Sequence, residues 1–156
     1  SGFGLTASAV RGDRRLVMVI NGLDSVRARS SESERLLNWG FRVFDNYKLF
    51  EAGETVEDAQ VWLGDAGTVP LVIEDALAVT IPKSSRQGMR VKVMYDGPIP
   101  APISAGVEVA RIEVTAPDME PISRPLKTAS DVGQLDFFGR ITSAINFIVF
   151  GSSSGG

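Results

Sequence analysis

A helical pattern of apolar positions lies near residue 40, between two regions with different patterns. One helical face carries Leu36, Leu37, Gly40, Phe41 and Phe44. The opposite face carries Arg35, Asn38, Arg42 and Asp45. This spacing predicts a helix that packs on one side, with an apolar face that faces a core and has no chemistry of its own.

The residues before this helix predict a β-hairpin. Residues 3–9 alternate between larger apolar and small side chains, which is typical of a strand with one buried face. Residues 16–20 are apolar at every position, which predicts a strand covered on both faces. The sequence Arg11-Gly12-Asp13-Arg14 supplies the turn, and we interpret its Arg-Gly-Asp tripeptide as turn chemistry, not as an adhesion motif.

The start of the helix has more than one candidate cap. Asp24 or Ser25 would cap a helix that begins directly after Asn21-Gly22. Ser31 and Glu34 match a capping box further along. The pattern alone leaves these alternatives open.

From Tyr47 onward, glycines and prolines divide the chain into runs that are too short for helices, which predicts an all-β domain. The expected strands are Val56–Leu63, Thr68–Ile73, Leu77–Ile81, Met89–Tyr95, Val107–Val114 and Glu120–Thr128. They favour a small sandwich of antiparallel strands. Three prolines make residues 97–102 an extended loop and argue against a central strand there.

The last pattern is an amphipathic helix over residues 135–150. Its apolar sector contains Leu135, Phe137, Phe138, Ile141, Ile145, Ile148 and Phe150. Sixteen residues make a helix of about 24 Å, which is short for a membrane span. The pattern leaves open whether the helix lies in a membrane surface or packs on the β domain or a partner. Residues 152–156 are rich in Gly and Ser and predict a flexible tail.

Composition excludes several kinds of site. The chain has no cysteine and no histidine, so it cannot by itself build a Ser-His-Asp triad, a thiolate nucleophile or a histidine metal centre. We therefore expect no metal site and no cofactor. A net charge of −3 from interspersed charges gives no footprint for nucleic acid. The first residues already resemble the middle of a structured region, and we expect the start at Ser1 to be a cut.

Three blocks of the sequence resemble the low-molecular-mass penicillin-binding proteins, the serine D-alanyl-D-alanine carboxypeptidases. These blocks are Gly2-Phe3-Gly4-Leu5-Thr6-Ala7-Ser8-Ala9, Leu36-Leu37-Asn38-Trp39-Gly40-Phe41 and Phe137-Phe138-Gly139-Arg140. The resemblance runs from the first residue to about Gly151 and implies the carboxy-terminal part of such a protein. It implies an α/β fragment, a hairpin plus the closing helix of a penicillin-recognising domain, followed by the all-β antiparallel sandwich and the C-terminal amphipathic helix.

The resemblance divides the chain into four regions. Residues 1–46 would be the last piece of the catalytic domain, residues 47–130 the β-rich second domain, residues 131–151 the membrane anchor and residues 152–156 the tail. The family is also expected to bury Trp39 where the closing helix meets the next domain. That burial predicts a cost of about 3–5 kcal/mol for Trp39→Ala.

The chemistry of this family uses a Ser-x-x-Lys nucleophile motif, a Ser-x-Asn motif and a Lys-Thr-Gly strand. None of these motifs occurs in the chain. Lys127-Thr128-Ala129 comes near the third, but it lacks the glycine, and we interpret it as a coincidence. The resemblance implies that the parent protein is a hydrolase, a serine peptidase that trims peptidoglycan stem peptides and binds β-lactams. This chain alone has no catalytic residue and is expected to be inactive.

Placement and support are the roles that the resemblance leaves for this chain. Arg29 matches by its distance from Leu36-Leu37 an arginine near the substrate cleft, while an exposed helical arginine is the alternative. The family's anchor implies a periplasmic location, peripheral on the outer face of the inner membrane, with the apolar sector of residues 135–150 in the membrane surface. Cell-wall enzymes are candidate partners of the β domain. A different class of function is a non-catalytic membrane-associated spacer or protein-binding module.

Overall fold

The computed structural model describes residues 2–135, and these residues form two compact units. Unit 1 contains the residues up to Tyr47 together with Ala78–Gly88 and Ala116–Asp118. Unit 2 contains Lys48–Leu77, Met89–Thr115 and the residues from Met119 onward. The described chain is mostly β-sheet with one α-helix. The predicted amphipathic helix lies outside the described residues, apart from Leu135.

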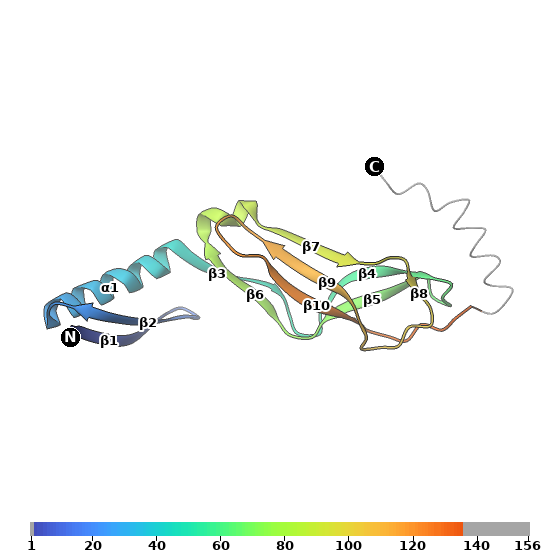
Figure 1. Cartoon of the computed structure of the whole chain (residues 1–156), viewed down its shortest axis with the longest axis horizontal. Coiled ribbons are helices and arrows are strands. Elements are labelled where there is room, and N and C mark those ends of the chain that lie inside the picture. Colours follow the sequence, from blue (N-terminus) through green and yellow to red (C-terminus); the bar gives the residue numbers. More distant parts are fainter. Residues whose placement is uncertain (1, 136–156) are drawn as a thin grey trace. The chain divides into compact units, whose positions relative to one another are not determined.

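Unit 1 begins with the predicted hairpin. Strand β1 (Phe3–Arg11) pairs antiparallel with β2 (Arg14–Leu23), and helix α1 (Val26–Val43) packs against the two strands (Figure 1). Leu16, Met18 and Ile20 are half-buried, whereas Val17 and Val19 are each 67% exposed. The prediction of a strand covered on both faces is therefore wrong for the described chain, because α1 covers only one face of a two-stranded hairpin.

Helix α1 begins at the second of the candidate caps. Ser25 is the N-cap, and its Oγ accepts a hydrogen bond of 3.1 Å from the backbone N–H of Ala28. This bond satisfies one of the backbone donors that the first helical turn leaves without a partner. The helix ends at Val43, where the backbone N–H of Phe44 bonds to the carbonyl of Gly40. The helix therefore contains the predicted apolar positions up to Phe41, whereas Phe44 and Asp45, which the spacing also assigned to it, begin the next strand.

A second β ladder follows the helix directly. Strands β3 (Phe44–Phe50) and β6 (Leu77–Pro82) form a two-stranded sheet, and the short 3₁₀ helix η1 (Lys83–Gly88) follows β6. Within unit 1, Thr80 Oγ1 donates to Asn46 Oδ1 over 2.8 Å. Strand β3 was not predicted, because its mixed sequence continues the helical pattern through Phe44.

Unit 2 is built on a six-stranded sheet in the order β7-β9-β10-β5-β4-β8 (Figure 1). Its strands are β4 (Thr55–Trp62), β5 (Thr68–Ile73), β7 (Arg90–Tyr95), β8 (Ile99–Pro100), β9 (Glu108–Thr115) and β10 (Ile122–Thr128). The prediction of purely antiparallel pairing is wrong at one edge, where β8 runs parallel to β4. Proline-rich β8 has two residues and lies at the end of the sheet, which agrees with the expectation of no central strand there.

Alternation of side chains places the core of unit 2 on one face of this sheet. Val69, Leu71 and Ile73 of β5 are at most 2% exposed, as are Ile112 and Val114 of β9. Full burial of each such side chain contributes about 1.5–3 kcal/mol to folding before entropy is counted. Side chains along these strands thus alternate between the core and the other face of the sheet, which is the two-residue period of a strand with one buried face.

Candidate functional site

Arg29, the predicted substrate-cleft residue, lies in the first turns of α1 and is half-buried. Its backbone is held on both sides: its N–H donates to the carbonyl of Ser25 over 3.0 Å, and its own carbonyl accepts from Ser33 Oγ over 2.6 Å. Ser33 is 5% exposed, so its hydroxyl bonds back to the helix in a buried position. The helix therefore fixes the backbone of Arg29, and its role toward a substrate stays a prediction.

Two arginines at the hairpin turn share one aromatic ring on α1. The guanidinium carbon of Arg11 lies 4.7 Å from the centroid of the Phe41 ring, and that of Arg14 lies 5.5 Å from it. Phe41 is 7% exposed. Arg11 Nη2 also donates to Asn38 Oδ1. Cation–π contacts of this kind tie the hairpin turn to the C-terminal part of the helix.

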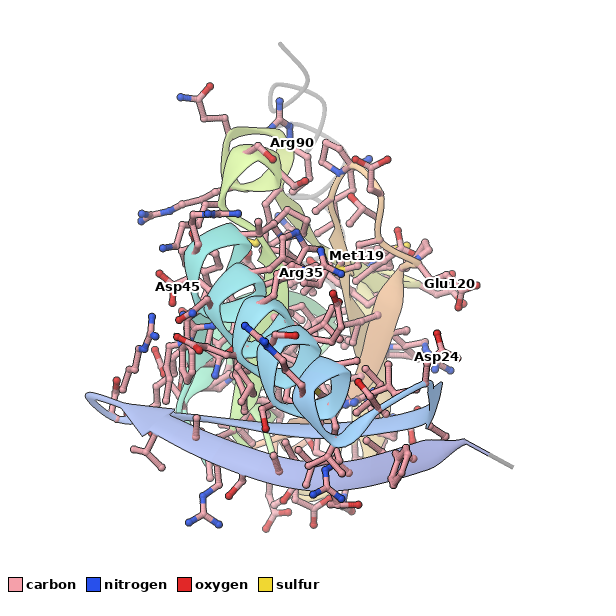
Figure 2. The ribbon with its side chains drawn as sticks, turned by 90° about the vertical axis from the view of Figure 1, so that its left-hand side faces the viewer. Asp24, Arg35, Asp45, Arg90, Met119 and Glu120 are labelled. Carbon is pink, nitrogen blue, oxygen red and sulfur yellow. The ribbon has the colours of Figure 1, made fainter. Side chains whose placement is uncertain are left out.

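Arg14 makes the most connections in this cluster. Its Nη1 lies 3.3 Å from Asp45 Oδ1 and donates to the carbonyl of Phe41 over 3.5 Å. Positive charge at this position also suits the negative end of the helix dipole. Figure 2 shows Asp45 just beyond the C-terminal end of α1 and Arg35 on the helix itself. Sequence reasoning missed this cluster, since only the folded hairpin brings residues 11 and 14 to Phe41.

An apolar hollow of about 310 Å³ lies beside the same helix. It is lined by Leu16, Val17, Met18, Leu36, Leu37, Trp39, Gly40, Phe44 and Thr80. The rings of Trp39 and Phe44 meet edge to face with centroids 5.2 Å apart. Gly40 allows the close approach of α1 to β2, because a Cβ added there would lie 2.8 Å from Leu16 Cδ1.

Trp39 contradicts one expectation. It is 45% exposed, so it is not buried in the described chain. Helical spacing explains this, because residue 39 lies between the apolar face that contains Gly40 and Phe41 and the polar face that contains Asn38. The energetic cost predicted for Trp39→Ala therefore has to be lowered for this chain.

Lys127 and Thr128, which come near the third family motif, lie in β10, and both have structural partners outside that strand. Thr128 is 1% exposed; its Oγ1 donates to the carbonyl of Ser104 over 2.6 Å and accepts from the N–H of Val107 over 3.1 Å. Lys127 Nζ lies 2.6 Å from Glu74 Oε2, and this hydrogen bond raises the pKa of Lys127 above 10.5. These contacts support the interpretation of the partial motif as a coincidence.

The first residues of the predicted anchor region are hydrogen-bonded to one end of unit 2. The N–H of Leu135 donates to the carbonyl of Leu63 over 3.0 Å, and Gln134 forms a bridge with Gly64. Asp65 Oδ1 accepts from the N–H of Gly133 over 2.9 Å. Leu135 is half-buried and not helical. The other predicted anchor residues are Phe137, Phe138, Ile141, Ile145, Ile148 and Phe150, and they lie outside the described residues.

Two features are absent from the described residues. No group of three or more acidic, His or Cys side chains is arranged to hold a metal ion between residues 2 and 135. In the same part of the chain, no helix has the length and hydropathy required to span a bilayer.

Comparison with known proteins identifies the family. Residues 44–134 match the family described as "Penicillin-binding protein 5, C-terminal domain". This match covers more than half of the chain, and the chain belongs to this family. The predicted resemblance to the carboxy-terminal part of the low-molecular-mass penicillin-binding proteins is thereby confirmed.

Individual relatives agree with this family. The chain is 35% identical over 143 residues to D-alanyl-D-alanine carboxypeptidase DacD of Escherichia coli, covering 91% of this chain and 37% of the relative. It is 34% identical to DacC of the same organism, covering 90% and 36%. The crystal structure of penicillin binding protein 5 from Haemophilus influenzae superposes with a TM-score of 0.71 at 29% identity, covering 84% and 39%. The chain thus spans little more than a third of these relatives.

Proposed function

We propose that the chain is the carboxy-terminal part of a D-alanyl-D-alanine carboxypeptidase and that it supports and places a catalytic domain. The observation that carries this proposal is the match of about nine-tenths of the chain to proteins with that name. In the proposed reaction, a serine of the catalytic domain attacks the terminal D-Ala-D-Ala bond of a stem peptide, D-alanine leaves, and water releases the shortened peptide. The chain itself contains none of the three motifs for this chemistry.

The open face of the hairpin supports a structural role in a larger domain. Val17 and Val19 point to the face of β2 that α1 does not cover, and both are 67% exposed. Two exposed valines on the same face of a strand leave apolar surface in water, and covering that surface would contribute burial free energy. We propose that further elements of a penicillin-recognising domain cover this face and the hollow beside Trp39.

Arg29 is the residue of this chain that we propose to act nearest to the substrate. A guanidinium can bind a carboxylate through two parallel hydrogen bonds, which suits the terminal carboxylate of a stem peptide. The two backbone bonds that fix its helical turn would hold the base of the side chain in place. In this proposal α1 closes the domain with one face and presents Arg29 with another.

Labelling with a fluorescent penicillin tests the proposed division of labour. The 156-residue chain is incubated with the reagent beside a longer protein that also carries the three motifs. We expect a covalent band for the longer protein and none for the chain alone, because only a motif serine can form the acyl-enzyme. A covalent band on the isolated chain would place a nucleophile in it and contradict the proposal.

Membrane placement is the second part of the proposal. We propose that residues 136–150 form an amphipathic helix on the outer face of the inner membrane, in the periplasm, with the β-rich sandwich as a spacer. The hydrogen bond of Leu135 to Leu63 would fix the point at which this helix leaves unit 2. Liposome flotation compares the chain with a form that ends at Leu135. The complete chain should float and the shorter form should not; equal flotation would contradict the anchor.

A further inference from the structure

The β7 edge of the six-stranded sheet combines three features that other parts of unit 2 lack. Strand β7 (Arg90–Tyr95) pairs with β9 on one side, and among the described strands nothing pairs with its other side. It has six residues and no proline, whereas the opposite edge, β8, has two residues and a proline. Strand β7 therefore presents a row of backbone donors and acceptors that a further strand can pair with.

Exposed apolar side chains of unit 2 gather at the same edge. Val91 is 41% exposed and Met94 is 45% exposed. Val91 lies opposite Val114, which is fully buried, so Val91 belongs to the core face and is uncovered only because the sheet ends there. Met94 lies on the other face of the strand. One added strand would therefore bury apolar surface on both faces.

The outer face of β7 also carries positively charged side chains. Alternation places Arg90, Lys92 and Met94 on this face, opposite Thr115, Glu113 and Arg111 of β9. An open groove of about 750 Å³ runs beside the second half of the strand, and both Met94 and Arg111 line it. The first half of the face thus carries two cations two residues apart. The second half presents Met94 beside a groove that Asp96, Glu108 and Arg111 also line.

From these features we propose that β7 binds an extended acidic peptide segment of another protein by strand addition. In the antiparallel direction that prevails in this sheet, the peptide places an apolar residue against Met94. Two carboxylates follow at alternate positions against Lys92 and Arg90. Main-chain bonds provide the affinity and the alternate side chains provide the selectivity. The inference does not depend on the carboxypeptidase assignment, because it uses contacts of unit 2 alone.

The probe is a fluorescent peptide, Thr-Leu-Thr-Glu-Val-Glu-Thr, whose binding to the 156-residue chain is followed by fluorescence anisotropy. Two N-methylated forms of it carry methyl groups on one or the other alternate set of backbone nitrogens. Only one edge of the peptide can face β7, so one form should lose at least tenfold in affinity and the other should keep it. Any other pattern, including no binding of the unmodified peptide, would overturn strand addition.

Protein variants locate the site. Lys92→Ala should weaken the unmodified peptide about tenfold, while Lys83→Ala, which removes an exposed lysine of η1, should leave its affinity unchanged. Equal effects of the two variants would overturn the assignment to β7. Sedimentation at the same concentrations should show that the chain is a monomer. If it instead shows a dimer that Lys92→Ala dissociates, the partner of β7 is a second copy of the chain, and the proposal of a peptide from another protein is overturned.

Discussion

The guanidinium of Arg14 and the carboxylate of Asp45 form an ion pair, with Nη1 and Oδ1 3.3 Å apart. The Arg14 side chain is 15% exposed and the Asp45 side chain 37%, so the pair is partly shielded from water. Arg14 also lies over the ring of Phe41. One side chain therefore connects the hairpin to the end of α1 and to the first strand after it.

Replacement of Arg14 tests this connection. Arg14→Ala should lower the free energy of unfolding by about 1–2 kcal/mol, because it removes a cation–π contact and a hydrogen bond to the helix terminus. Urea denaturation followed by the helical circular dichroism signal measures the change. Arg15→Ala removes an exposed neighbouring arginine and should stay within about 0.5 kcal/mol of the unmodified chain. If both variants lost the same free energy of unfolding, the contacts of Arg14 would not stabilise the fold.

Substitution of Phe41 and substitution of Trp39 should lower the free energy of unfolding by very different amounts, although the two residues are near neighbours on α1. Phe41→Ala should destabilise the chain by about 3–5 kcal/mol, since the ring is buried. Trp39→Ala should cost only about 1 kcal/mol, mainly through its edge-to-face contact with Phe44. Denaturant unfolding of the two variants measures both values. If Trp39→Ala proved as costly as Phe41→Ala, the hollow beside α1 would have to be filled in the isolated chain.

The Lys127–Glu74 pair predicts a dependence on high pH. Because the pKa of Lys127 is raised in the folded state, its pairing stabilises the fold fully below 10.5 and loses this effect as the pH rises through the folded pKa. Glu74→Gln should therefore be less stable than the unmodified chain at neutral pH, and the difference should shrink above that pKa. Thermal unfolding across this range measures it, with Glu57→Gln as an exposed control. A difference that persists with the lysine deprotonated would rule out the ion pair as its cause.

Substitution of Thr128 tests whether the partial motif has a structural or a catalytic role. Thr128→Val keeps the shape but leaves the carbonyl of Ser104 and the N–H of Val107 without this partner, which should cost about 1–3 kcal/mol. In the longer protein, the same substitution should leave the rate of penicillin labelling unchanged. Thr68→Val, at an exposed position of β5, provides the stability control. Loss of labelling by a stably folded Thr128→Val protein would show that the residue does take part in the reaction.

Local patterns predicted the elements of the fold more fully than their pairing. The division of the chain by glycines and prolines predicted a strand over residues 68–73, and the structure gives β5 the same bounds. Strand β3 was missed, since Phe44 suited the helical face as well as a strand. The parallel pairing of β8 with β4 was also missed, because residues far apart in the chain have to meet before it forms.

The residues of the candidate site also differ in how far the sequence alone could predict them. Arg29 could be selected only through its distance from a family block, and the structure adds the bonds that fix its backbone. The cluster of Arg11 and Arg14 on Phe41 had no sequence signal beyond a turn flanked by arginines. Exposure of Trp39 could not be predicted, because burial depends on which neighbours are present and not on the residue itself.

The release of D-alanine from diacetyl-Lys-D-Ala-D-Ala measures whether the longer protein is a carboxypeptidase and whether this chain alone has that activity. The 156-residue chain and the longer protein with the three motifs are assayed at equal concentration, and the longer protein is assayed again after acylation with penicillin. We expect release by the longer protein, its loss after acylation, and none from the chain alone. Release of D-alanine by the isolated chain, or no release by the longer protein, would contradict the proposal that this chain is the non-catalytic part of a carboxypeptidase.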